Sequence, residues 1–193
     1  FNMEKLDTAP EEEAIKVEAR HFMSGIVPAE PEPTAVATRS ADGADIVKAW
    51  KSTYAAALAK DDDGALMEQF WSIYDSEATS IWTMVYDEAD SNENVQQTID
   101  LVASFLKEDG MKSIKAHCFG VVHTLDNLDI EGVWLFNGPD PTELFGANED
   151  SSWYTFSQLG PDATDLVKKA VASILVPTDK ALNGKGIKDT QVF

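Results

Sequence analysis

The sequence predicts an α+β domain, in which helices pack on an antiparallel β-sheet. Apolar residues before position 75 recur at helical spacing, whereas those of residues 80–86 alternate along the chain as in a strand. Residues 113–125 and 130–137 read as two further strands, and a polar loop of hairpin length joins them. Strands and helices do not alternate regularly along the chain, which favours an antiparallel sheet over a parallel one.

The composition is that of a folded and strongly acidic protein. Of the 193 residues, 44% are hydrophobic and 25% are charged, close to the average of globular proteins. The formal net charge is −19, which would repel the phosphate backbone of a nucleic acid. We therefore expect no direct nucleic-acid partner. Such a surface either simply solvates the protein or attracts basic proteins or divalent cations.

Neither a membrane span nor an intramolecular disulfide is expected. No apolar run reaches the roughly 18 to 20 residues of a membrane helix. Cys118 is the only cysteine and has no partner within the chain, so the fold does not depend on an oxidising compartment. The chain begins with Phe1 rather than Met, which leaves open whether a leader has been removed or the sequence starts late.

Residues 1–40 are predicted to form an acidic, proline-containing arm. A short amphipathic helix is expected after Pro10, followed between residues 27 and 35 by prolines that impose an extended linker. The apolar stripe of this helix could fold back on the domain or dock on a neighbouring protein. Its candidate interaction residues are Ile15, Phe22 and Met23.

Two helices are expected to follow the arm. The first lies within residues 41–63 and leads into the domain, which we place at residues 64–193. Residues at helical spacing keep one face of this first helix apolar: Ile46, Trp50, Tyr54 and Leu58. An aspartate run ending at Asp63 interrupts it, and a second, shorter helix with Leu66 and Phe70 on its apolar face comes next.

Residues 92–107 are predicted to form a further helix, with Asn92 as its N-cap and Asp109 and Gly110 at its end. After the hairpin, a long acidic loop at residues 140–150 precedes a strand at residues 153–159.

The last helix is expected at residues 162–176, with Leu166 and Ile174 on its inward face. Pro177 stops this helix. The tail after Leu182 is rich in Gly and Lys, and we expect it to be irregular.

Three aromatic motifs occur in a fixed order along the chain. The first runs from Phe70-Trp71 through Ser-Ile-Trp to Tyr86, the second is Gly-Val-Trp-Leu-Phe-Asn-Gly within residues 130–138, and the third is Trp-Tyr-Thr-Phe within residues 153–159. This order and spacing resemble the conserved C-terminal domain of eukaryotic translation elongation factor 1B gamma. The resemblance covers about residues 66–185.

The resemblance implies the compact α+β fold of that family and a scaffold role within a complex, since the exchange activity of the family belongs to other subunits. Residues 1–63 do not resemble the glutathione-transferase-like half that precedes this domain in the family. We therefore expect a stand-alone or truncated copy of the domain. Its acidic charge also departs from the basic tail of the family.

The aromatic residues of these motifs are predicted to form the core that defines the fold, because large aromatic side chains bury extensive apolar area. The predicted core aromatics are Phe70, Trp71, Tyr74, Trp82, Tyr86, Trp134, Phe136, Trp153 and Tyr154. A core of this kind would hold loops in place. Within the acidic loop, Leu144 and Phe145 are predicted to be exposed and are further candidate interaction residues.

No catalytic constellation, metal site or cofactor site is predicted. His117 and Cys118 are adjacent on a predicted strand, so their side chains would point to opposite faces. His117 and His123 would share a face but lie roughly 20 Å apart, too far to bind one metal. Asp90, Asn92 and Asn94 match the start of a calcium loop, but Val95 and Leu101 stand where its glycine and glutamate belong.

We therefore predict a non-catalytic interaction or scaffold subunit of a larger assembly, bound to other protein subunits in the cytoplasm. One alternative is an imported plastid protein, an accessory or linker subunit peripheral to a photosynthetic membrane complex, since plastid leaders in some algae are cut just before a Phe. A second alternative, from another class, is an enzyme whose site is assembled from residues far apart in the sequence.

Overall fold

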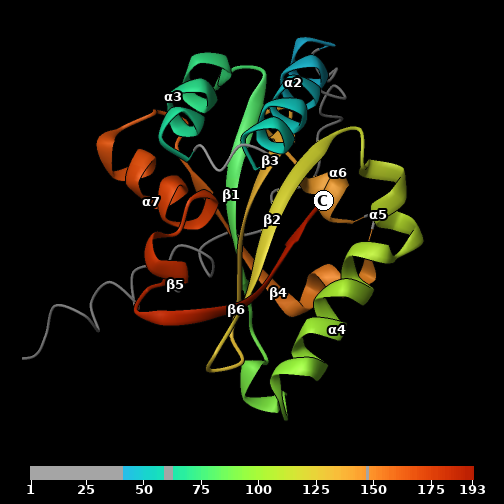
Figure 1. Ribbon diagram of the computed structural model, residues 1–193. Helices are drawn as coiled ribbons and strands as arrows, with labels where there is room; N and C mark the ends of the chain where they lie inside the picture. The colour runs from blue at the N-terminus through green and yellow to red at the C-terminus, as the bar shows by residue number, and fades with distance from the viewer. Residues whose placement is uncertain (1–40, 59–62, 147) are drawn as a thin grey trace, which may run out of the picture. The chain divides into compact units, whose positions relative to one another are not determined.

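The computed structural model describes residues 41–58, 63–146 and 148–193. Figure 1 shows the helices and strands along the chain. In chain order they are α2 (Ala41–Leu58), α3 (Asp63–Ile73), β1 (Thr79–Tyr86), η1 (Ala89–Ser91), α4 (Val95–Lys107), α5 (Asp109–Ile114), β2 (Cys118–Leu125), β3 (Ile130–Asn137), α6 (Thr142–Phe145), η2 (Glu149–Trp153), β4 (Tyr154–Leu159), α7 (Asp165–Leu175), η3 (Thr178–Lys180), β5 (Ala181–Leu182) and β6 (Lys185–Val192).

The strands form one antiparallel sheet in the order β4-β1-β3-β2-β6-β5, which confirms the predicted α+β class. Strands β2 and β3 pair as a hairpin, as predicted, with Phe119 opposite Leu135. Strand β1 lies between β3 and β4, and Tyr86 at its end is opposite Tyr154 at the start of β4. This last pair positions the site described below.

Helices cover both faces of the sheet (Figure 1). On one face, α2, α3 and α7 contribute residues such as Trp50, Phe70 and Val171 to a buried cluster with alternate residues of β1, β2 and β3. On the other face, α4, α5 and α6 pack over a second cluster that contains Trp134 and Phe136. Because successive side chains of a strand point to opposite faces, β1, β2 and β3 each supply residues to both clusters.

Helix α2 packs into the domain core through its apolar face. Val47, Trp50 and Tyr54 are buried, while Leu58 at the end of the helix is 56% exposed. The Trp50 ring makes an edge-on contact with Phe70 of α3 at a centroid distance of 4.6 Å. The first two predicted helices therefore pack against each other in the same core.

Three boundaries differ from those predicted. The N-cap of α4 is Asn94, whose side chain accepts a hydrogen bond from the amide of Gln97, whereas Asn92 donates to the carbonyl of Leu128. Asp109 does not end a helix but begins α5, and this helix occupies residues that were predicted to start a strand. As a result, β2 begins only at Cys118.

The C-terminal part of the prediction needs two corrections. The tail after Leu182 is not irregular, because residues 185–192 form β6 and pair with β2 along the sheet. In α7, which is capped by the Thr164 side chain, Leu166 points outward and is 78% exposed. The buried residues of this helix are Val171, Ile174 and Leu175.

None of the helices in the described parts of the chain combines the length and apolar character needed to cross a membrane.

Candidate functional site

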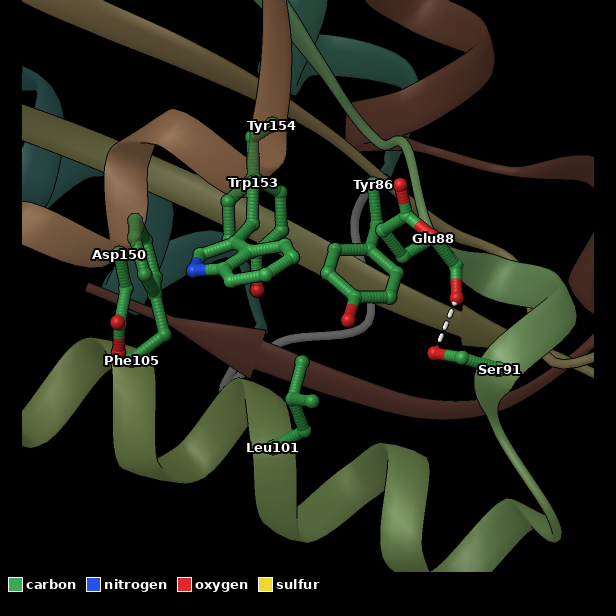
Figure 2. A pocket seen from close by; sticks show the side chains of 8 residues that line it. All are labelled: Tyr86, Glu88, Ser91, Leu101, Phe105, Asp150, Trp153 and Tyr154. Atoms are coloured by element: carbon green, nitrogen blue, oxygen red, sulfur yellow. Dashed lines mark hydrogen bonds between the residues drawn. The ribbon is translucent and has the colours of Figure 1, made fainter.

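A cavity of about 360 Å³ opens at the end of the sheet where β1 stops and β4 begins. Figure 2 shows its lining, to which the ends of the two strands and one face of α4 contribute large aromatic and aliphatic groups. The lining residues are Tyr86, Glu88, Ser91, Leu101, Phe105, Asp150, Trp153 and Tyr154. The volume lies at the lower end of the range of roughly 300 to 1,000 Å³ that is typical of ligand pockets.

The strand side of the cavity is built by the paired residues Tyr86 and Tyr154. Their ring centroids lie 5.1 Å apart. The amide of Asp87 donates a 3.0 Å hydrogen bond to the carbonyl of Trp153, and the Thr155 hydroxyl donates a 2.8 Å bond to Oδ1 of Asp87. Pairing of β1 with β4 is thus continued by one more residue on each strand, which holds Trp153 beside Tyr86 (Figure 2).

The opposite side of the cavity is supplied by α4. Leu101 and Phe105 are one helical turn apart and so lie on the same face of the helix. Phe105 is 3% exposed and contacts the Tyr154 ring at a centroid distance of 4.7 Å. Figure 2 shows Leu101 reaching from α4 toward the indole of Trp153 and the ring of Tyr86.

Asn148 connects the η2 turn to α4 through hydrogen bonds. This residue is 5% exposed, and its side-chain amide donates a 3.1 Å hydrogen bond to the carbonyl of Phe105. Its side-chain oxygen accepts a 2.9 Å bond from the amide of Asp150 and so caps η2. One buried side chain therefore fixes η2, with Asp150 and Trp153, relative to α4.

The rim is acidic and its aromatic member is exposed. Glu88 and Asp150 are both exposed to solvent, and Trp153 is 52% exposed. Ser91 donates a 2.7 Å hydrogen bond to the main-chain carbonyl of Glu88, which fixes the η1 turn at the rim (Figure 2). None of the eight described lining residues is basic.

Tyr154 places its hydroxyl at the cavity. The residue is 6% exposed, and burial raises its pKa far above the ordinary value of 10, with smaller contributions from Tyr86 and Asp150. Among the residues that the structure describes, neither this hydroxyl nor that of Tyr86 has a hydrogen-bond partner. The hydroxyl is therefore neutral and available to a ligand.

Of the nine predicted core aromatics, four are buried, four are partly buried and one is exposed. Phe70, Trp134, Phe136 and Tyr154 are at most 6% exposed. Four further residues are partly buried against the two clusters, namely Trp71, Tyr74, Trp82 and Tyr86. The prediction is wrong for Trp153, which ends η2 before β4 begins and therefore faces the rim of the cavity rather than the core.

The predicted exposure of Phe145 is also wrong. Its ring packs against Trp82, Phe136 and Phe156, with the Phe156 centroid only 4.2 Å away. The short helix α6 brings it onto the sheet, because Phe145 ends that helix on the side of the second cluster. The side chain of Leu144 and the residues Ile15, Phe22 and Met23 lie outside the described residues.

His117, His123 and Cys118 are not among the residues that line the cavity. Cys118 is fully buried, as predicted, and burial raises the pKa of its thiol to about 12, which makes it a poor nucleophile. His117 lies in the turn before β2 rather than on the strand. His123 is buried, with Nε2 on the carbonyl of Ile174 and Nδ1 on the Thr190 hydroxyl.

No group of three or more His, Cys, Asp or Glu side chains that could hold a metal ion occurs in the described part of the chain. The cavity combines aromatic faces, two tyrosine hydroxyls and two carboxylates, which are groups that can contact a ligand. The cavity cannot be predicted from local sequence patterns, because helix α4 with Leu101 and Phe105 and the segment with Asn148 lie far apart in the chain. The Asn-Glu-Asp run at residues 148–150 was the one local signal, since Asn before acidic residues is typical of a helix cap.

An antiparallel sheet between two helical layers, with a ligand-sized aromatic cavity at one end, defines the class of this chain as an α+β domain. The family described as "Elongation factor 1 gamma, conserved domain" matches residues 33–140. The chain belongs to this family, as its aromatic motifs indicated.

Similar proteins are found in plants. Elongation factor 1-gamma 2 of Oryza sativa subsp. japonica is 26% identical over 152 residues, which cover 77% of this chain and 35% of that protein. Probable elongation factor 1-gamma 2 of Arabidopsis thaliana is 25% identical over 148 residues, covering 75% of this chain and 35% of the relative. The chain thus spans about a third of the length of the curated relatives that it matches.

Proposed function

We propose that this chain is a non-catalytic interaction subunit of a larger protein assembly related to elongation factor 1, and that it acts in the cytoplasm. The observation that carries the proposal is the family match over residues 33–140, which includes α2 through β3 and therefore most of both core clusters. The named relatives are elongation factor 1-gamma proteins.

The physical character of the domain supports a binding role. Aromatic side chains pack in continuous contact through both clusters, for example Trp50 with Phe119 and Trp134 with Phe136. Such packing gives a rigid support for surface features. Among the described residues, the thiol of Cys118 and the imidazole of His123 are buried in the sheet and do not line the cavity.

The proposal is tested by isolating the chain with its partners. The tagged full chain would be expressed in the organism that encodes it, and native extracts would be separated by size-exclusion chromatography. We expect the chain to elute well before the monomer volume, together with other subunits of elongation factor 1 identified by mass spectrometry. Elution as a monomer, or with a photosynthetic membrane complex, would contradict the proposal.

A charge control is needed because a protein with a net charge of −19 attracts basic proteins without specificity. An unrelated tagged protein of similar net charge serves this purpose. Washing the isolated complex at ~1 M salt, where the screening length falls to about 3 Å, removes partners held only by long-range attraction. Partners that persist through the wash and are absent from the control support the proposed function.

A further inference from the structure

The cavity between β1, β4 and α4 has a chemistry that selects one kind of ligand. It is lined by the buried rings of Phe105 and Tyr154 together with the ring of Tyr86 and the indole of Trp153 (Figure 2). The faces of aromatic rings carry negative electrostatic potential, and the indole is the strongest of them. A cation in this cavity is therefore stabilised before any charged group is considered.

The carboxylates act in the same direction. Glu88 reaches the rim from the turn after β1, and Asp150 reaches it from η2. They come from opposite ends of the cavity in Figure 2, so a ligand that enters between them meets a carboxylate on each side. Because no described lining residue is basic, this negative charge is not neutralised within the cavity. An anionic ligand would be repelled.

The hydroxyl of Tyr154 adds a group that can hydrogen-bond to a ligand. A tyrosine hydroxyl without a partner in the protein can donate a hydrogen bond to a ligand or accept one from it. The Tyr154 hydroxyl has no partner among the described residues, although its residue is 6% exposed. A purely aliphatic side chain would fill the space but leave this group unsatisfied.

A planar cation with several donors meets all three conditions. A guanidinium group stacks on an indole, donates to hydroxyl and carboxylate oxygens in different directions, and stays charged at any physiological pH. An ammonium group has a single compact charge that is more strongly hydrated and stacks less well. The long aliphatic stem of an arginine would in addition lie against Leu101 at the mouth of the cavity.

We propose that the cavity lined by Tyr86, Trp153 and Tyr154 is a docking site for an arginine side chain on a basic segment of a partner protein. The proposal rests on the proposed function, because it names the contact by which an interaction subunit would hold its partner. Charge complementarity decides the occupant, since the acidic rim and the aromatic walls both favour a cation over a neutral or anionic group.

The test uses the purified full chain and short capped peptides. An acetylated and amidated Gly-Arg-Gly peptide is titrated while the indole N–H signal of Trp153 is followed by NMR. The signal is assigned by its loss in Trp153→Leu, because the chain contains five tryptophans. We expect saturable shifts of this signal and of the amides of residues 87 and 150.

Three comparison peptides separate the contributions to binding. Replacing arginine with citrulline keeps the shape but removes the charge, and we expect affinity to fall by at least about tenfold. Replacing it with lysine should weaken binding by a smaller factor, and trimethyllysine should bind less tightly than arginine. Affinity for the arginine peptide should also decrease as salt is added.

Two pairs of variants provide matched controls in the protein. Tyr154→Phe removes only the hydroxyl and should weaken the arginine peptide about three- to tenfold with no loss of thermal stability. Tyr74→Phe, which removes a hydroxyl bonded to Pro161 on the other face of the sheet, should leave peptide affinity unchanged. In the same way, Glu88→Gln should weaken binding, whereas Glu68→Gln on α3 should not.

Several outcomes would overturn the proposal. Equal affinities for the citrulline and arginine peptides would show that the positive charge of the ligand does not contribute to binding. Tighter binding of trimethyllysine would identify a quaternary-ammonium site instead. Absence of any shift at Trp153 would exclude the cavity as the docking site. The chain could also associate with itself in the absence of peptide. If the double variant Arg20→Gln, Arg39→Gln abolished this association, the occupant of the cavity would be a second copy of the chain.

The outcomes for the cavity and for the assembly are independent. Peptide titration needs no partner protein, and co-elution with elongation factor 1 subunits needs no assumption about the cavity. If the chain co-elutes but binds no arginine peptide, the docking site is wrong and the proposed function stands. If the peptide binds but the chain elutes alone, the docking site stands and the proposed function is wrong.

Discussion

The side-chain amide of Asn148 donates a 3.1 Å hydrogen bond to the main-chain carbonyl of Phe105, which joins the η2 turn to α4. The same side chain caps η2 through the amide of Asp150. Replacing Asn148 with Ala removes both bonds and leaves a buried carbonyl without its partner. We expect Asn148→Ala to lower the free energy of unfolding by about 1–3 kcal/mol, measured by urea denaturation.

Asn148→Ala should also weaken the arginine peptide, because Trp153 and Asp150 would no longer be held against α4. Asn127→Ala is the matched control, since the Asn127 side chain is exposed and bonds to the side chain of Asp129 in the hairpin loop. It should change stability by less than about 0.5 kcal/mol and leave peptide affinity unchanged. Equal effects of the two substitutions would refute the role given to Asn148.

Gly120 faces Trp134 across the β2–β3 pair, and a Cβ at position 120 would come within 2.6 Å of the Trp134 ring. The indole cannot move freely, because it is 1% exposed and donates a hydrogen bond to the sulfur of Met84. Gly120→Ala should therefore lower the free energy of unfolding by about 1–3 kcal/mol through overpacking. Urea denaturation measures this change.

A double-mutant cycle identifies the cause of that loss. In a Trp134→Leu background the ring is absent, so Gly120→Ala should cost less than it does in the parent chain. The same cost in both backgrounds would mean that the added methyl group disturbs something other than Trp134. The register of β2 against β3 is the structural basis of this expectation.

His123 should make stability depend on pH. Burial lowers its pKa below the ordinary value of 6.5, although its bond to the Ile174 carbonyl and the charge of Asp189 act in the opposite direction. As pH falls below about 6.5, the unfolded chain binds a proton before the folded chain does. The contribution of neutral His123 to stability is therefore present above this pH and is lost as pH falls toward the lowered folded-state pKa.

The prediction for His123 concerns a slope rather than an absolute stability. The free energy of unfolding, measured by urea denaturation between about pH 7.5 and pH 5, should fall less steeply in His123→Gln than in the parent chain. An identical slope would show that His123 does not lose its proton preferentially on folding. Other titrating groups are the same in both chains, so they cancel in the comparison.

The sequence predicts an exposed Phe145 and an inward-facing Leu166, and the structure shows the reverse. Phe145 contacts three aromatic rings of the second cluster, whereas Leu166 is 78% exposed on α7. Phe145→Ala should therefore lower the free energy of unfolding by about 1–3 kcal/mol, because an aromatic contact and a partly buried ring are lost. Leu166→Ala should change it by less than about 0.5 kcal/mol. Thermal denaturation of both variants measures the two losses. A larger loss of stability in Leu166→Ala than in Phe145→Ala would contradict this prediction.

The parts of the fold that depend on local patterns were predictable from the sequence. Residues 130–137 form β3 with the predicted bounds, and Trp82, Met84 and Tyr86 share one face of β1 as their alternation indicated. Strand β6 was missed because its composition is rich in Gly and Lys and its pairing partner β2 lies far earlier in the chain. In α7, several overlapping faces are apolar, and only the packing against the sheet selects the one with Val171.

Three members of the candidate site, Tyr86, Trp153 and Tyr154, could be singled out from the sequence, whereas Phe105 could not. Tyr86 and Tyr154 were identified as important, but as core residues, since nothing in their local sequence places them opposite each other in the sheet. The sequence pattern predicts Trp153 on a strand. In the structure this residue instead ends η2, which is capped by Asn148. Cavities of this kind arise from tertiary pairing of distant segments, which periodicity does not report.

Association with the other subunits of elongation factor 1 tests the central claim most directly. The purified full chain would be mixed with these subunits from the same organism, and the mass of the resulting species measured by size-exclusion chromatography with light scattering. Our account predicts a stable species of defined stoichiometry that persists at ~1 M salt, where long-range attraction is screened, and that is weakened by Trp153→Leu. Elution of the chain as a monomer beside unchanged subunits would contradict it.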